Sequence, residues 1–451
     1  MSSIEKQKIN ISDPSGARTR HHHALNLNAL ADRYESSLRQ YMPAAPCRDY
    51  YLWATSSDNP QRKAYLQVTG IAQLAKLTTA VLDGLIDDDW EQLTDYSAIM
   101  NTYLLYETAS DNLAFGLRSA QPQDATFRLR RNLLYTFNLA VLKRLNGDCR
   151  PAAKLLESMQ SAARRISSFD QSLSRDKHVE LTQEYLCLKP DVCLNDLEYS
   201  VWPLLVANVE VCIDLVKSID ICQVGPFMRE GLVARYQAVN SLLKANDMTL
   251  PQLANAGMRS SLIMPLLTYY IAVLVEIIRP QPRIASLIAD GTLTTVICDA
   301  ALLFRLLNDL GTAVCTLTPK RQTALLHQLA SWHRRHSEST HTIFDVFIGI
   351  ADESAILTRL RKDVLFGEFN VGLYGLDDAK SMPEAFDTFG RNIDYFVQLY
   401  TYHYARLEEN LTIIDARLNT DIVSELILRF IRFHQRMYST SYRIMDGDYA
   451  V

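Results

Sequence analysis

Long stretches of this chain contain neither glycine nor proline, and this feature most constrains what the chain can fold into. Only 16 glycines and 15 prolines occur among 451 residues, and apolar residues recur at helical spacing between them. Glycine and proline are the residues that oppose helices most strongly. The few Asp-Gly and Asn-Gly dipeptides do not lie between alternating runs of strand type. The sequence therefore predicts an all-α fold.

The breaks between periodic segments predict a succession of helices. Thr249 and Thr318 each place a capping hydroxyl close to a proline of the first helical turn. A polar segment over 1–25, which includes three consecutive histidines, is expected to be a flexible tail. An N-terminal helical extension over 26–120 and a helical core over 121–451 are expected to follow. We expect the later helices over 124–146, 151–168, 198–222, 227–246, 250–278, 292–317, 319–337, 342–366, 383–417 and 420–440.

Charge and apolar content limit the classes of partner. A net charge of −5 with both signs interspersed gives no support to nucleic-acid binding. The most apolar run, 262–275, is 14 residues long and contains Pro265, so we expect no membrane span. Eight cysteines occur without a Cys-x-x-Cys pair, and the start of the chain is polar. Reduced thiols and a cytoplasmic location are the expectation.

Three oxygen-bearing side chains stand four residues apart in the segment from Phe304 to Thr316. Asn308, Thr312 and Thr316 would share one face of a helix that is otherwise apolar. Hard oxygen ligands of this kind suit Mg²⁺, which keeps several waters and is usually completed by substrate phosphates. The spacing therefore predicts a magnesium site made by these three residues.

The same segment resembles the second metal-binding motif of class I terpene synthases. In that family Asn or Asp, Ser or Thr, and Glu stand four apart after an Arg-Leu pair, whereas the last position here is Thr316. The resemblance covers about residues 150 to 400. It implies an all-α, class I terpenoid synthase-like bundle whose helices surround an apolar cavity.

A second resemblance lies upstream, over residues 249–261. It is similar to the helix of the same family that breaks near the reacting carbons and carries an arginine that senses diphosphate. Arg259 stands 49 residues before Asn308 (308 − 259), and Gly257 with Ser260 and Ser261 predicts a kink. The resemblance thus implies diphosphate binding by Arg259, with further basic residues, Lys320 and Arg321, after the metal helix.

The acidic first motif of the family has two competing candidates. Asp170 follows a helical run and stands 138 residues before Asn308 (308 − 170), close to the family interval. Asp83 and Asp87 would place two carboxylates on one helical face, but Asp83 lies 225 residues before Asn308 (308 − 83). Asp170 is the favoured metal ligand and catalytic residue on spacing, and the Asp83 and Asp87 pair stays open.

These parts together imply an enzyme that ionises and cyclises an allylic prenyl diphosphate. With Mg²⁺ as cofactor and farnesyl diphosphate as substrate, the product would be a sesquiterpene hydrocarbon such as humulene. The degenerate motifs are similar to those of divergent fungal humulene-type sesquiterpene cyclases. A monomer or a homodimer is expected, with Asp170, Arg259 and Asn308 as the catalytic residues.

Two alternatives remain at this stage. A trans-prenyltransferase would use the same metals, but it needs two strongly acidic motifs, and only Asp309 is acidic within the second one. A non-catalytic helical scaffold would explain the departures from the family motifs, and it would bind no diphosphate.

Overall fold

The computed structural model is helical throughout the part of the chain that it describes, namely residues 14–86, 88–114, 125–169, 175–244, 247–338, 342–350 and 353–439. In these ranges the sole β-type pairing is an isolated bridge between Asp83 and Ile86. The all-α prediction is therefore confirmed.

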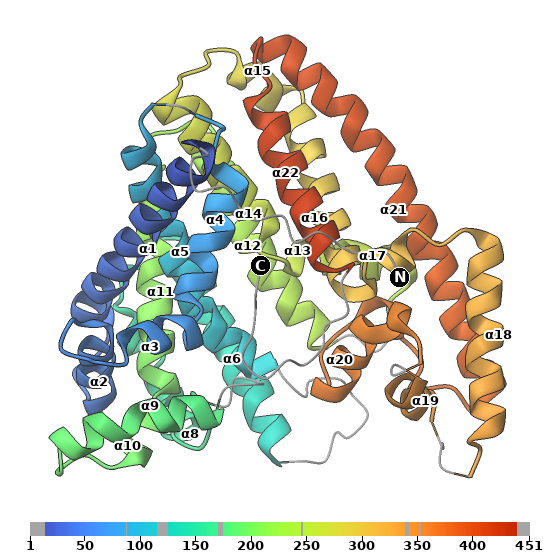
Figure 1. Ribbon diagram of the computed structural model, residues 1–451, viewed down its shortest axis with the longest axis horizontal. Helices are drawn as coiled ribbons and strands as arrows, with labels where there is room; N and C mark the ends of the chain where they lie inside the picture. Colours follow the sequence, from blue (N-terminus) through green and yellow to red (C-terminus); the bar gives the residue numbers. More distant parts are fainter. Residues whose placement is uncertain are drawn as a thin grey trace, which may run out of the picture.

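The N-terminal helices form one side of the molecule (Figure 1). Helix α1 packs along α4, α5 and α11, with Leu30 and Leu38 completely buried. The five helices of this part are α1 (Pro14–Tyr41), α2 (Pro46–Thr55), α3 (Arg62–Val68), α4 (Ile71–Leu82) and α5 (Trp90–Ala114).

The predicted flexible tail over 1–25 is wrong from residue 14 onward, because α1 begins at Pro14. His22 is buried, its Nδ1 lies 2.8 Å from Oδ1 of Asp83, and its ring stacks on Trp90 with a centroid distance of 4.0 Å. The polar residues of this segment thus find partners on α4 and α5, which composition alone does not reveal.

The middle of the chain supplies helices that pack against the N-terminal side and lead to α13 and α14. Helix α11 packs against α1, α5 and α6, and α12 packs against α6, α13 and α14. The prediction of one helix over 151–168 is wrong, because three short pieces lie there. Nε1 of Trp202 donates to the carbonyl of Leu156, which lies between the first two pieces, at 2.9 Å. The elements are α6 (Ala125–Leu145), α7 (Ala152–Leu155), η1 (Glu157–Met159), α8 (Gln160–Ala163), α9 (Arg175–Leu188), α10 (Leu194–Glu198), α11 (Val201–Lys217) and α12 (Gly225–Leu242).

The predicted kink near Gly257 is confirmed. Helix α13 (Leu250–Ser260) ends there, and α14 (Ile263–Ala272) continues into a π-helical segment, η2 (Val273–Ile278), after a bend of 47°. The hydroxyls of Ser260 and Ser261 donate to the carbonyls of Gly257 and Met258 at the end of the broken helix. Thr249 caps α13 as expected, whereas Thr318 occupies the cap position of α18 without a side-chain bond.

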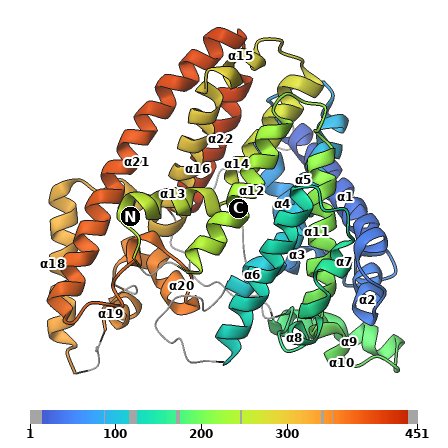
Figure 2. The same cartoon turned by 180° about the vertical axis from the view of Figure 1, so that it is seen from behind.

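Helix α16 (Thr292–Leu310) is the centre of the C-terminal side, seen from behind in Figure 2. It contacts α13, α14, α20, α21 and α22. The other elements here are α15 (Ile284–Ala289), α17 (Thr312–Cys315), α18 (Pro319–Arg335), α19 (Ile343–Ile350), η3 (Ala355–Leu357), α20 (Thr358–Phe366), η4 (Val371–Leu373), α21 (Met382–Leu418) and α22 (Ile422–Met437).

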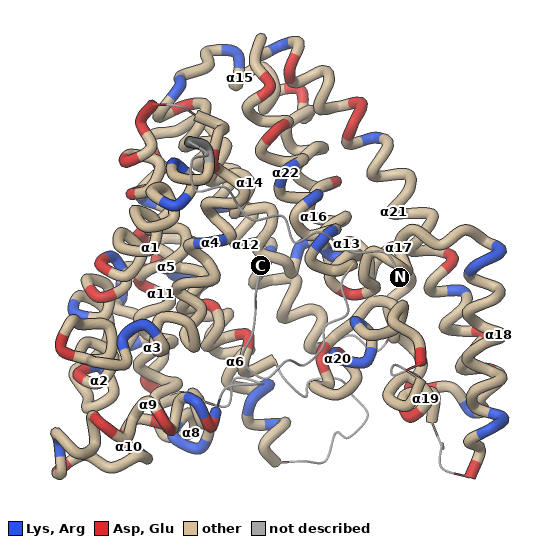
Figure 3. Tube along the Cα trace, in the orientation of Figure 1, with Lys and Arg blue, Asp and Glu red and all other residues tan. Residues whose placement is uncertain are grey.

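The long apolar helices and the distribution of charged residues bear on two expectations, that the chain neither spans a membrane nor binds nucleic acid. Within the described ranges, the stretch Leu194–Lys217 is long and apolar enough to cross a membrane, and 61% of its apolar window is buried inside the protein. The bent pair Leu250–Ser260 and Ile263–Ile278 passes the same test if it is taken as one span. Buried core helices also pass such a test. Basic and acidic residues alternate over both sides of the molecule (Figure 3).

Candidate functional site

Glycine 311 sets the end of helix α16. Its φ of 80° and ψ of 157° lie in a region that essentially only glycine occupies. The helical ladder therefore stops at Leu310, and α17 begins separately at Thr312. The expectation of one helix from 292 to 317 is wrong at this point.

The break removes the predicted row of metal-facing oxygens. The hydroxyl of Thr312 donates to the carbonyl of Gln435 at 2.6 Å, and the hydroxyl of Thr316 donates to the carbonyl of Thr312 at 2.9 Å. Thr316 is exposed, while Asn308 lies on the preceding helix. As they lie, Asn308, Thr312 and Thr316 do not fit Mg²⁺ in the way the spacing predicts.

The side-chain carbonyl of Asn308 already accepts hydrogen bonds from two residues that are distant in the sequence. Its Oδ1 accepts from Nη2 of Arg359 at 2.8 Å and from the hydroxyl of Tyr438 at 2.9 Å. The Nε of Arg359 also donates to the main-chain oxygen of Asn308. A carbonyl oxygen has two lone pairs, so these contacts use its accepting capacity.

Asp309, the next residue, is completely buried and fully hydrogen-bonded. Its Oδ2 accepts from Nε of Arg305 at 2.9 Å and from the main-chain N–H of Val371 at 2.9 Å, and its Oδ1 accepts from Asn308. Burial raises the pKa of Asp309, and the charge of Arg305 opposes that rise. This acid therefore holds Arg305 and the first residue of η4, Val371.

A second buried acid completes the group. Asp363 of α20 is 1% exposed; its Oδ2 accepts from Nδ2 of Asn370, which also donates to the main-chain oxygen of Asp309. Burial raises the pKa of Asp363, the charge of Arg359 lowers it, and Glu368 and Asp309 raise it further. We call the following residues the Asn308 cluster: Arg305, Asn308, Asp309, Arg359, Asp363, Asn370 and Tyr438.

Two charged residues adjoin the Asn308 cluster. Nζ of Lys362 lies 3.9 Å from Asp363 and 3.0 Å from Glu368. Burial raises the pKa of Asp111, which stands one turn before the end of α5, and the charges of Arg235 and Glu107 affect it more than those of Glu368 and Lys362.

One turn further into α5, Glu107 forms a buried ionic group. It accepts from the hydroxyl of Tyr236 at 2.6 Å and from Nδ2 of Asn208 at 3.0 Å, and it lies 2.6 Å from Nη2 of Arg235. Arg235 also lies 3.5 Å from Asp111. The sequence analysis did not identify Glu107 and Asp111 as candidates. These two acids stand four residues apart near a helix end, which is the same pattern that indicated Asp83 and Asp87.

The candidates for the first acidic motif lie elsewhere. Asp170 and Asp87 are outside the described residues, so their metal-binding role stays a prediction. Asp83 joins α4 to α1, because it accepts from the hydroxyl of Thr19 at 2.6 Å and pairs with His22. Burial alone would raise the pKa of Asp83, but these two hydrogen bonds outweigh it and lower the pKa.

The structure does not gather the predicted cationic residues at Asn308. Arg259 is exposed on α13, and its charge acts on Cys298, near Arg406. The residue of α13 that faces the Asn308 cluster is Gly257, where an added Cβ would lie 3.3 Å from Cγ of Arg305. Lys320 and Arg321 are exposed in the first turn of α18. In the part of the chain with assigned structure, no hydrogen bond or ion pair joins Arg259, Lys320 or Arg321 to Asn308.

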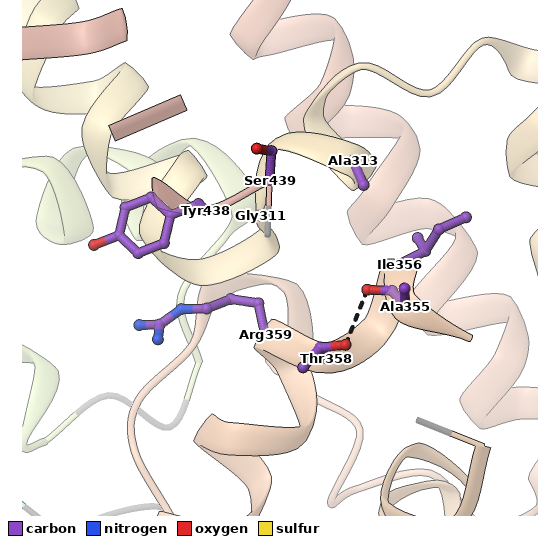
Figure 4. Close-up of a pocket in the computed structure, with 8 residues that line it drawn as sticks. All are labelled: Gly311, Ala313, Ala355, Ile356, Thr358, Arg359, Tyr438 and Ser439. Atoms are coloured by element: carbon purple, nitrogen blue, oxygen red, sulfur yellow. Dashed lines mark hydrogen bonds between the residues drawn. The ribbon is translucent and has the colours of Figure 1, made fainter. Parts of the chain in front are cut away.

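A small pocket borders the Asn308 cluster (Figure 4). Its volume is about 20 Å³, which is room for one water molecule. The guanidinium of Arg359 and the ring of Tyr438 point the same way from its wall. The lining residues are Gly311, Ala313, Ala355, Ile356, Thr358, Arg359, Tyr438 and Ser439.

Neither a metal-binding group among the described residues nor a similar protein indicates a function for this chain. Among the described residues, no three His, Cys, Asp or Glu side chains come together as a metal site would require. All eight cysteines are free thiols, and three of them, Cys149, Cys187 and Cys193, are exposed. No protein-family model, no curated protein and no solved structure matches the chain.

Proposed function

We propose that this protein is a terpene synthase of the class I type, which ionises an allylic prenyl diphosphate, with farnesyl diphosphate as the first substrate to test. The segment from Phe304 to Thr316 carries the sequence resemblance. The 47° bend between α13 and α14, both of which contact α16, supports the same proposal.

The position of Lys362 carries the proposal. The Asn308 cluster stands at the C-terminal turn of α16, and Nζ of Lys362 lies 3.9 Å from Asp363 of that cluster. Helix C-termini and carboxylates are both negative, so cations are favoured where the two meet. Lys362 is 27% exposed and therefore open to solvent, which suits a group that receives an anionic substrate. Arg359 of the same helix adds a planar, charge-assisted donor.

The chemistry follows from these residues. The allylic C–O bond breaks, and its electron pair leaves on the diphosphate oxygen, where Lys362 and Arg359 stabilise the growing charge. The aromatic rings of Phe304, Phe430 and Tyr438 lie together beside Asn308, with centroids 5.8 and 6.3 Å from that of Phe304. Ring faces of this kind stabilise a carbocation, and transfer of a proton from the carbocation to the released diphosphate then gives the hydrocarbon. Asn308, Thr312 and Thr316 do not fit Mg²⁺ as they lie, because their oxygens already take part in hydrogen bonds within the protein.

Incubation of the full chain with ten-, fifteen- and twenty-carbon prenyl diphosphates, with product analysis by mass spectrometry, tests the proposal. We expect a cyclic fifteen-carbon hydrocarbon from the parent protein. Lys362→Met should reduce kcat/KM by roughly tenfold to a hundredfold, because one stabilising charge is lost in the transition state. Lys154→Met, at an exposed lysine of α7, is the matched control. Absence of product from all three substrates would reject the proposal.

A non-catalytic helical scaffold is the second candidate, and a specific observation favours it. Most polar groups of the Asn308 cluster already bond to one another, and the adjoining pocket has room for only one water. A scaffold would retain the cluster for stability alone. It predicts that Lys362→Met and Lys154→Met behave alike in every diphosphate-binding assay.

A further inference from the structure

The two buried acids of the Asn308 cluster are held by different numbers of donors. The carboxylate of Asp309 accepts three hydrogen bonds, one of them from the guanidinium of Arg305 at 2.9 Å. Asp363 accepts one, from Nδ2 of Asn370 to its Oδ2 at 2.7 Å. Its Oδ1 is buried and accepts no hydrogen bond in the described part of the chain. A negative charge is therefore compensated on Asp309 and poorly compensated on Asp363.

The two neighbouring cations do not replace the missing donor. Nη2 of Arg359 lies 3.7 Å and Nζ of Lys362 lies 3.9 Å from Oδ1 of Asp363. A charge-assisted hydrogen bond to a carboxylate is shorter, at roughly 2.7 to 2.9 Å. Arg359 bonds instead to Asn308 at 2.8 Å, and Lys362 lies 3.0 Å from Glu368. This geometry suits a carboxyl group that carries a proton better than a carboxylate.

The end of α20 places a further carboxylate beside Asp363. Gly367 has a φ of 59° and a ψ of 33°, the left-handed conformation that ends many helices. The main-chain N–H of Glu368 thereby donates back to the carbonyl of Asp363 at 2.9 Å. Burial raises the pKa of Asp363 to about 7, the charge of Arg359 opposes this rise, and the charges of Glu368 and Asp309 add to it.

Charged groups of the surrounding elements complete this environment. Lys362, on the same helix, lowers the pKa of the carboxyl group less than Arg359 does. Helix α16 contributes Arg305 and Asp309, which pair with each other. Helix α19 contributes Asp345, which accepts from a main-chain N–H at the start of its own helix, and η3 has no charged residue. Burial raises the pKa of Asp111 on α5 to about 6, so Asp111 serves as a control below.

We propose that Asp363 is a proton-binding switch that holds α20 against the end of α16 when it carries a proton and loosens this contact when it ionises. The link is Asn370, whose Nδ2 donates both to Asp363 and to the main-chain oxygen of Asp309. The pKa of Asp363 is higher in the folded than in the unfolded chain, so the stabilisation by the proton is lost as the pH rises through about 7. The switch does not require terpene synthase activity.

Infrared spectroscopy of the full chain tests whether the proton is present. The carbonyl band of a protonated carboxyl group should appear in the parent with a midpoint at about pH 7, and this transition should be absent from Asp363→Asn. The asparagine side chain can still accept from Asn370, and circular dichroism checks that the variant folds. Asp111→Asn is the matched control and should keep the transition. A transition that persists in Asp363→Asn, or none in the parent, would overturn the proposal.

Hydrogen exchange of the α20 backbone measures the loosening, after correction for the intrinsic pH dependence of exchange. Opening of α20 in the parent should be about tenfold more frequent at about pH 8 than at about pH 6, as a pKa of about 7 requires. Asp363→Asn, which stays neutral, should open equally at both pH values. Glu368→Gln removes a charge that raises the pKa, so the midpoint should move below 7. Equal opening of the parent at both pH values would contradict the switch, whether or not any prenyl diphosphate is turned over.

Discussion

At the residue scale, polar groups in this protein are satisfied mainly by one another. Asn308 bonds to Arg359 and Tyr438, and the carboxylate of Asp309 bonds to Arg305 and to the backbone of Val371. This arrangement depends on Gly311, which turns the chain so that Thr312 can hold the end of α22. The turn is a conformation that a residue with a Cβ adopts only under strain.

Gly311→Ala should therefore destabilise the protein by about 1 to 3 kcal/mol, because the φ of 80° becomes strained. Unfolding in urea, followed by circular dichroism, measures the change. Gly16→Ala in α1 is the control, since an added Cβ there meets only the end of Arg20 and the backbone is helical. Equal midpoints for the two variants would show that the Gly311 turn is not under strain.

At the element scale, two helices carry buried neutral histidines. His178 of α9 is 6% exposed and stacks on Phe169, and burial lowers its pKa to about 4. His434 of α22 is 5% exposed, and burial likewise lowers its pKa to about 4, although its bond to the carbonyl of Phe430 opposes the shift. In the unfolded chain a histidine titrates near 6.5. Acid should therefore destabilise both helices.

The folded pKa of His178 is lower than its unfolded pKa, so its contribution to stability is present above pH 6.5 and is lost as the pH falls toward 4. The full loss is about 3 kcal/mol. We expect the urea midpoint to fall over this window, and His178→Leu to reduce the fall. His327→Gln, at an exposed histidine of α18, should leave the pH profile as in the parent; an identical profile for His178→Leu would contradict the assignment.

At the scale of the whole molecule, Glu107 joins elements from distant parts of the chain. It belongs to α5, and its partners Asn208, Arg235 and Tyr236 belong to α11 and α12. Both Glu107 and Arg235 are almost completely buried, with side chains 1% and 6% exposed. Removing one charge from such a pair leaves the other uncompensated in a place that water does not reach.

Glu107→Gln should consequently destabilise the fold by about 3 to 5 kcal/mol, because buried Arg235 then keeps only the longer contact with Asp111, at 3.5 Å. Differential scanning calorimetry would show this as a lower Tm. Glu157→Gln is the control, because the side chains of Glu157 and its partner Lys154 are 62% and 64% exposed, and exposed pairs contribute little. A Tm for Glu107→Gln close to that of the control would mean that the buried pair adds nothing to stability.

The sequence by itself determined the features that depend on neighbouring residues. Apolar spacing and helix breakers predicted the all-α class, the bounds of helices such as α12, α18 and α21 to within a few residues, the Thr249 cap and the kink after Gly257. Each of these is decided within one or two helical turns, because backbone propensity, capping and side-chain periodicity act over that range.

The tertiary structure alone decided which polar groups meet. Asn308 is bonded by residues 51 and 130 positions away, and the spacing rule that aligned it with Thr312 could not anticipate them. The same holds for Asp83, whose partners come from α1, and for Glu107, whose partners come from α11 and α12. A buried polar group must find a donor or acceptor, and the helix that supplies it is set by packing across the whole chain and not by local sequence.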